Sequence, residues 1–180
     1  MSQVLLAVSA SVSIYKACDL ASKLTQAGHR VRCALTENAA RLVSPQLFAA
    51  VTGESAQVSE WGSARRTAMD HIDLARWADL VVVAPATASL CARLATGQGE
   101  DLVSTALLAV ETAKPRLLCP AMNPTMLANP AVARNLAQLA SDGWEVLEPG
   151  TGHMACGEAG SGRLPEPADI LARVSARLTE

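Results

Sequence analysis

The sequence predicts an α/β protein with a Rossmann-like, doubly wound parallel sheet, arranged as three α/β/α layers in a single domain over residues 1–180. Short apolar runs alternate with helical patterns along the chain, which favours parallel strands joined by right-handed crossovers. Half of the residues are hydrophobic but only 3% are aromatic. The core must therefore be built from Ala, Val and Leu, which let helices pack closely against a sheet.

The first half of the chain opens with an apolar strand over residues 4–8, followed by a helical pattern over 13–27 that ends at Gly28. A second strand is expected over 29–35, and Thr36 begins a helix that runs to Leu42. Another helical pattern covers 44–51, whereas residues 53–69 are polar and irregular. These segments form strand–helix units of a parallel sheet.

The second half of the chain contains the most apolar strand, residues 79–84, which is bounded by Pro85. Apart from Asp79 at its start, this run has no polar residue, which is typical of a strand buried on both faces, so we place it at the sheet centre. The remaining strands are expected over 116–119 and 144–147. The remaining helices are expected over 72–78, 87–94, 101–111, 126–142 and 168–177, and a long glycine-rich loop over 149–167.

Composition excludes several classes of function. The formal net charge is −2 without a basic run, which argues against nucleic acid as a partner. The apolar start is too short for a membrane span and lacks the features of a signal peptide. The five cysteines are odd in number and widely spaced, unlike a disulfide framework or a CxxC metal site. We expect a cytoplasmic protein with no membrane association and no metal.

Polar loops follow three of the expected strands, at Ser9-Ala10-Ser11, Thr36-Glu37-Asn38 and Thr87-Ala88-Ser89. Ligands of such sheets bind at the carboxyl ends of the strands, where hydroxyls and helix-end amides suit a phosphate monoester. Each loop is also compatible with an ordinary helix N-cap. The dinucleotide pattern GxGxxG is absent after the first strand, so a mononucleotide is the expected cofactor.

Three chemically active side chains stand at positions typical of a site. Asn123 follows the strand at 116–119, Cys156 lies in the glycine-rich loop, and His71 precedes the central strand. An amide, a thiol and an imidazole can together hold a substrate and transfer protons. The other cysteines, Cys18, Cys33, Cys91 and Cys119, are expected to be buried small hydrophobic residues.

Motifs spread over nearly the whole chain resemble those of the FMN-dependent cysteine decarboxylases. They are Tyr15-Lys16-Ala17, His71-Ile72-Asp73-Leu74, Ala84-Pro85-Ala86-Thr87-Ala88, Asp101-Leu102-Val103-Ser104-Thr105, Pro120-Ala121-Met122-Asn123-Pro124-Thr125-Met126, and Ala155-Cys156-Gly157 through Gly162-Arg163. The pattern is most similar to phosphopantothenoylcysteine decarboxylase of coenzyme A biosynthesis. Peptide-cysteine decarboxylases share the fold and the PxMNxxM element.

The resemblance implies that FMN oxidises a substrate cysteine to a thioaldehyde, which then loses carbon dioxide to give an ene-thiol. It makes His71 a base or orienting group, Asn123 the ligand of the substrate carboxylate, and Cys156 the proton donor for reduction of the ene-thiol. Met122, Met126 and Ala155 would also contact substrate. The implied FMN contacts are Ser9, Ala10, Ser11, Val12, Thr36, Asn38, Thr87, Ala88, Ser89 and Ala121.

The family assembles as homotrimers or homododecamers, which implies that His71 serves a neighbouring subunit's flavin. Ala10 and Ser13-Ile14 depart from the family's first turn, which bears on flavin affinity. Oxidative decarboxylation of a precursor peptide's C-terminal cysteine therefore stays an alternative, although Leu127 and Cys156 weaken it. A non-catalytic flavin-binding regulatory subunit and a flavin prenyltransferase are further alternatives.

Overall fold

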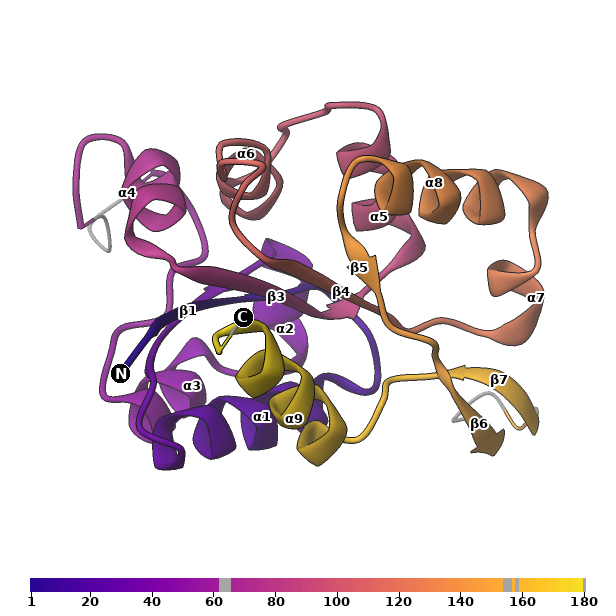
Figure 1. Ribbon diagram of the computed structural model, residues 1–180, viewed down its shortest axis with the longest axis horizontal. Coiled ribbons are helices and arrows are strands. Elements are labelled where there is room, and N and C mark those ends of the chain that lie inside the picture. The colour runs from indigo at the N-terminus through magenta and orange to yellow at the C-terminus, as the bar shows by residue number, and fades with distance from the viewer. Residues whose placement is uncertain (62–65, 154–156, 158, 180) are drawn as a thin grey trace.

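A five-stranded parallel sheet forms the centre of the molecule, as the computed structural model shows for residues 1–61, 66–153, 157 and 159–179 (Figure 1). The strand order is β2-β1-β3-β4-β5, and every neighbouring pair is parallel. The strands are β1 (Gln3–Val8), β2 (Arg30–Leu35), β3 (Leu80–Ala86), β4 (Arg116–Pro120) and β5 (Glu145–Val146). The predicted α/β fold with a doubly wound parallel sheet is thus confirmed.

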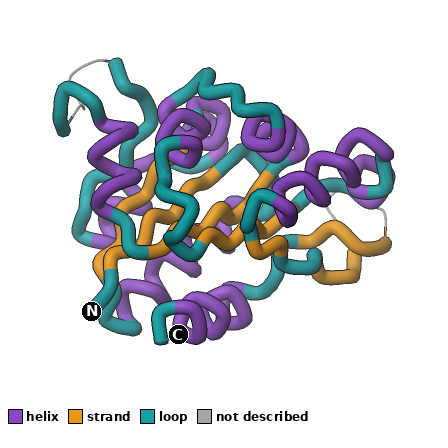
Figure 2. The backbone as a smooth tube through the Cα atoms, turned by 45° about the horizontal axis from the view of Figure 1, so that its top comes forward, coloured by secondary structure: helices purple, strands orange, loops and turns teal. Residues whose placement is uncertain are grey.

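Helices cover both faces of the sheet and give the predicted three layers (Figures 1 and 2). One layer consists of α1 (Ile14–Gln26), α2 (Glu37–Leu42), α3 (Pro45–Thr52) and α9 (Pro167–Arg177). The opposite layer consists of α4 (Asp70–Trp77), α5 (Ala88–Ala95), α6 (Leu102–Leu108) and α8 (Pro130–Ser141). Within the described residues, no helix has the length and hydrophobicity needed to cross a membrane.

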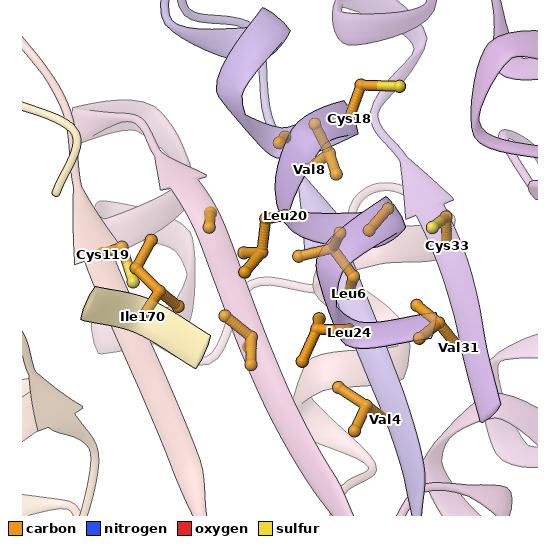
Figure 3. Close-up of a cluster of buried hydrophobic side chains, with 14 of the residues drawn as sticks. Val4, Leu6, Val8, Cys18, Leu20, Leu24, Val31, Cys33, Cys119 and Ile170 are labelled. Atoms are coloured by element: carbon orange, nitrogen blue, oxygen red, sulfur yellow. The ribbon is translucent and has the colours of Figure 1, made fainter. Parts of the chain in front are cut away.

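The core divides into two clusters because successive residues of a strand point to opposite faces. In β1, Val4, Leu6 and Val8 pack toward α1 and α9, whereas Leu5 and Ala7 belong to the cluster on the other face. Figure 3 shows the first cluster, in which Leu20 and Leu24 of α1 lie against β1. All seven residues of β3 are buried, as expected for the central strand.

The helix expected over 126–142 is wrong as a single element. The structure has α7 (Pro124–Leu127), a break, and then α8 from Pro130 to Ser141. Asn129 caps α8 by accepting a hydrogen bond from the backbone N–H of Ala131 at 2.9 Å. Pro130 cannot donate to a preceding carbonyl and favours the first position of a helix, so the chain restarts there.

The long loop expected over 149–167 is also corrected. Its described residues form an antiparallel hairpin of β6 (Gly150–His153) and β7 (Ala159–Arg163), which lies beside α7 (Figure 1). Glycine has low strand propensity, and the sequence pattern therefore hid the hairpin. At Gly160, a side-chain Cβ would lie 3.0 Å from Cγ of Pro124, so the lack of a side chain allows this close approach.

Phe48 is the chain's one phenylalanine, and it is fully buried on α3 in the cluster beneath β1 and β2. Phe48→Ala should lower the free energy of unfolding by about 3–5 kcal/mol, because it removes a large apolar side chain and leaves a cavity. Urea denaturation measures this loss as a shift in midpoint.

The neighbouring Leu47, which is 49% exposed, provides the control. Leu47→Ala should change the free energy of unfolding by only about 0.5 kcal/mol. Equal effects of the two substitutions would contradict the assignment of Phe48 to the core.

Candidate active site

A cavity of about 520 Å³ lies where β1, β2 and β3 end. Because the strands are parallel, the residues that follow them emerge at one edge of the sheet. The cavity is lined by Ser9, Ala10, Thr36, Glu37, Asn38, Val58, Ser59, Glu60, Trp61, Thr87, Ser89, Arg93, Glu100, Asp101 and Leu102. All three polar loops that the sequence singled out thus contribute to one cavity.

Ser9 joins the ends of β1 and β3. Its hydroxyl donates a hydrogen bond to the carbonyl of Pro85 at 2.8 Å and accepts one from the backbone N–H of Thr87 at 2.9 Å. The side chain is almost entirely buried, with 2% exposure. Ser9 therefore fixes the separation of two loops that line the cavity.

Thr36 and Thr87 are helix N-caps and cavity residues at the same time. The Oγ1 of Thr36 accepts a hydrogen bond from the N–H of Ala39 in α2, and the Oγ1 of Thr87 accepts one from Leu90 in α5. A hydroxyl that accepts in this way still carries a proton to donate. Each residue can therefore be a helix N-cap and a ligand contact at the same time. Both hydroxyls can still donate a hydrogen bond to an anion.

Asp101 and Arg93 form the charged wall of the cavity, with Arg93 Nη1 at 2.7 Å from Asp101 Oδ2. Asp101 also caps α6, since its carboxylate accepts from both the backbone N–H and the hydroxyl of Ser104. Burial raises the pKa of the Asp101 carboxyl, but the hydrogen bonds from Ser104 and Arg93 outweigh it and hold that pKa below the usual aspartate range. The Asp101 carboxyl is therefore ionised at neutral pH.

Sequence reasoning missed several residues of this cavity. Ser59, Glu60 and Trp61 come from the irregular segment before α4, which has no periodic pattern to follow. Asp101 stands in one of the motifs named above but was given no role in the site, although Asp is a preferred helix N-cap. Within the described residues, no group of three or more His, Cys, Asp or Glu side chains could hold a metal ion.

A second cavity, of about 280 Å³, adjoins the turn after β1. It is lined by Ser11, Val12, Ser13, Tyr15, Lys16, Met122, Asn123, His153, Gly162, Arg163 and Leu164. Ser11 and Val12, predicted as cofactor contacts, thus lie with Met122 and Asn123, predicted as substrate contacts. Ser9 and Ala10 of the turn line the first cavity, whereas Ser11, Val12 and Ser13 line the second.

Asn123 is held by its role as N-cap of α7, where Oδ1 accepts a hydrogen bond from the N–H of Met126 at 3.0 Å. The preceding Met122 is buried, and its N–H donates to the carbonyl of Gly162 in β7 at 3.0 Å. Met126 itself is 48% exposed. The segment that carries the amide is therefore bonded directly to the hairpin.

His71 lies in the first turn of α4, and its Nδ1 forms a hydrogen bond with Oε1 of Glu60. Glu60 lines the larger cavity, whereas Asn123 lines the smaller one. Figure 1 shows α4 and α7 at opposite ends of the molecule. The structure of one chain therefore does not bring the predicted imidazole and amide together.

Two further predicted flavin contacts, Ala88 and Ala121, follow the ends of β3 and β4. Ala88 is the first residue of α5, and the buried Ala121 donates its N–H to the carbonyl of Ala86 at 3.0 Å. Cys156 and Ala155 lie outside the described residues.

The other four cysteines are buried, free thiols, as predicted. Burial raises the pKa of the Cys33 and Cys119 thiols and raises the pKa of Cys91 to about 12. Cys18 has a raised pKa as well, first through burial and then through the charge of Asp19. These residues are thus poor nucleophiles.

Comparison with known proteins gives a consistent match along the chain. The model of the family described as Flavoprotein matches residues 1–179. The chain is 45% identical to the coenzyme A biosynthesis bifunctional protein CoaBC of Bacillus subtilis, over 93% of the chain and 41% of that protein. It is 39% identical to the CoaBC of Vibrio vulnificus, over 94% of the chain and 42% of that protein. The chain thus spans about two fifths of these relatives.

Solved structures share the fold over nearly the full chain. A cysteine-to-serine variant of PPC decarboxylase, complexed with pantothenoylaminoethenethiol, aligns with a TM-score of 0.86 and 28% identity, covering 99% of each chain. The FMN-dependent cysteine decarboxylase SpaF aligns with a TM-score of 0.83 and 30% identity, covering 99% of this chain and 96% of SpaF.

Ser9→Ala should destabilise the protein by about 1–3 kcal/mol, because the Thr87 N–H loses its acceptor and the Pro85 carbonyl keeps only the backbone N–H of Ser9, at 3.2 Å. Urea denaturation provides the measurement. Ser175→Ala is the matched control, since this hydroxyl is exposed and donates only to a carbonyl of its own helix. The role of Ser9 as a link would be refuted by equal midpoints for the two variants.

Asp101→Asn should destabilise the protein at pH 7, and its deficit relative to wild type should shrink at acid pH. The folded-state pKa of Asp101 is lowered, so its stabilising contribution is present above the ordinary aspartate pKa of about 4 and is lost as the pH falls through the folded value. Urea midpoints of both proteins at several pH values test this.

Asp19→Asn, which removes an exposed pair with Lys23, should have little effect throughout. A deficit for Asp101→Asn that is constant with pH would contradict the assigned charge interaction.

Proposed function

The chain belongs to the Flavoprotein family, and from this premise we propose that it is an FMN-dependent cysteine decarboxylase. The proposed reaction converts phosphopantothenoylcysteine to phosphopantetheine in coenzyme A biosynthesis. The observation that carries the proposal is the cavity of about 520 Å³ into which three hydroxyl-bearing loops converge. The names of the relatives, CoaBC and PPC decarboxylase, support this choice of substrate.

The residues of the cavity fit a flavin mononucleotide. Its volume is in the usual range for small-molecule sites, and Thr36 and Thr87 supply hydroxyls beside two helix starts for a phosphate. When bound, FMN supplies the hydride acceptor for oxidation of the substrate cysteine. The proposed contacts are Ser9, Ala10, Ser11, Val12, Thr36, Asn38, Thr87, Ala88, Ser89 and Ala121.

Asn123 is proposed to bind the substrate carboxylate. Its cap bond to Met126 fixes the plane of the amide, and the amide nitrogen is a donor without charge. A neutral donor orients the carboxylate and adds no cation that would stabilise the charge before carbon dioxide leaves. Met122, Met126 and Ala155 are the other proposed substrate contacts, of which Met122 shares a cavity with Asn123.

His71 is proposed as the base or orienting group, because an imidazole exchanges protons near neutral pH. Cys156 is proposed to donate the proton that completes reduction of the ene-thiol. These roles preserve redox balance, since the substrate is first oxidised and then reduced.

A complete site is proposed to form between subunits of a homotrimer, or of a homododecamer built from trimers. The support is that α4, which carries His71, and α7, which Asn123 caps, lie at opposite ends of one chain (Figure 1). In the proposed assembly, each of these residues therefore completes a site with a neighbouring subunit. We further propose that residues 1–180 form a single flavoprotein domain that works in the cytoplasm.

Oxidative decarboxylation of a peptide's C-terminal cysteine is a second candidate. The observation that favours it is the similarity to SpaF, at 30% identity and a TM-score of 0.83. The two candidates differ in their product, because the peptide reaction stops at the oxidised ene-thiol whereas the coenzyme A reaction returns two hydrogens.

Mass spectrometry of products distinguishes the two reactions when the flavin-loaded protein is given phosphopantothenoylcysteine or a peptide ending in cysteine. We expect loss of carbon dioxide alone from phosphopantothenoylcysteine. Loss of carbon dioxide and two hydrogens from the peptide would instead establish the second candidate, and no conversion of either would overturn both.

Asn123→Ala should lower kcat/KM by roughly 10- to 150-fold, the effect of losing a hydrogen bond to a charged group. Asn129→Ala is the matched control, because Asn129 caps α8 as Asn123 caps α7. Each substitution should cost about 1 kcal/mol of stability through the lost cap. An equal loss of activity in both variants would remove Asn123 from the proposed substrate site.

A further inference from the structure

We propose that Glu60 is a positioning residue for His71, which it holds in the tautomer with the proton on Nδ1 so that Nε2 is the proton acceptor. The assignment of His71 to catalysis rests on the proposed function, whereas the pair itself is a feature of the structure. No motif in the sequence pointed to Glu60, which lies in the irregular segment before α4.

The contact between the two side chains is direct. Oε1 of Glu60 forms a hydrogen bond with Nδ1 of His71 across eleven positions of sequence. The side chains are 26% and 22% exposed, so they are partly shielded from water yet open to a ligand. Among the residues that the structure describes, Glu60 has no second ion pair, and its carboxylate is committed to the imidazole.

The tautomer follows from the chemistry of the two groups. A carboxylate accepts hydrogen bonds but cannot donate them, so Nδ1 must carry the proton. In a neutral imidazole the other nitrogen then has the lone pair, and Nε2 of His71 becomes the basic atom. Carboxylate partners fix the ring and tautomer of functional histidines in the same way at other sites.

The backbone around both partners is anchored independently. Gln57 lies alongside β2, donating its N–H to the carbonyl of Cys33 at 2.9 Å and accepting from the N–H of Leu35 at 2.8 Å. Asp70, immediately before His71, is 2% exposed and accepts from the N–H groups of Arg66 and Thr67. Glu60 is thus three residues from a fixed strand contact, and His71 follows a buried carboxylate that is bonded to the turn before α4.

The nearby carboxylates of Glu54 and Asp73 form ion pairs with arginines. Glu54 binds Arg30 and Arg66, and Asp73, two residues after His71, binds Arg32. These ion pairs connect the segment to β2 and α4 without contacting the imidazole. Glu60 also lines the larger cavity, whereas His71 is not among the residues that line it.

The test is Glu60→Gln, compared with Glu60→Asp and the control Glu54→Gln. A glutamine both donates and accepts, so it no longer dictates the tautomer. We expect Glu60→Gln to lower kcat for phosphopantothenoylcysteine by roughly 10- to 100-fold with KM unchanged. Glu60→Asp should recover part of the rate, and Glu54→Gln, which loosens the same segment without touching His71, should change kcat less than about twofold.

Nitrogen NMR of the purified protein labelled at histidine gives a readout that does not need turnover. The chain has three histidines, so the His71→Gln variant identifies the signals of His71. Wild type should show a protonated Nδ1 and an unprotonated Nε2, and Glu60→Gln should show a mixture of tautomers.

Two results would overturn the inference: the same tautomer in wild type and Glu60→Gln, or equal losses of kcat in Glu60→Gln and Glu54→Gln. If wild type converts neither substrate, the proposed function fails, and the NMR comparison still decides whether Glu60 sets the tautomer of His71.

Discussion

The parallel pairing of β1 with β2 on one side and with β3 on the other is the constraint on which the candidate site depends. It brings Ser9, Thr36 and Thr87 to one edge of the sheet, directly after the strands end. From there the chain enters α1 on one face and α5 on the opposite face, so the loops diverge and leave room between them (Figure 1). The hydroxyl of Ser9 then fixes that separation.

The parts of this architecture with strong local patterns could be predicted from the sequence. The apolar run that became β3 has no polar side chain to face water, which is typical of a strand buried on both faces. The helical pattern after β1 ends at Gly28, which has a φ of +89°. The loop residues Thr36 and Thr87 were identified because capping and ligand binding require the same side chain.

Other features depend on contacts that sequence spacing does not record. Glu60 lies close to His71 because the preceding Gln57 pairs with Ala34 of β2. No periodic pattern in the sequence predicts this isolated bridge. The hairpin of β6 and β7 is rich in glycine, and its stability comes from its partners rather than from strand propensity. The separation of His71 from Asn123 follows from the strand order, which sequence patterns alone do not determine.

The hydrogen bond from the N–H of Met122 to the carbonyl of Gly162 joins the hairpin to the segment that carries Asn123, so the two form one rigid unit. Pro124 packs against Gly160 in the same unit, which stiffens it further. A molecule that presses on the hairpin therefore also displaces the group proposed to hold its carboxylate. Under the proposed function, changes within β7 should therefore alter both the choice of substrate and the rate of its conversion.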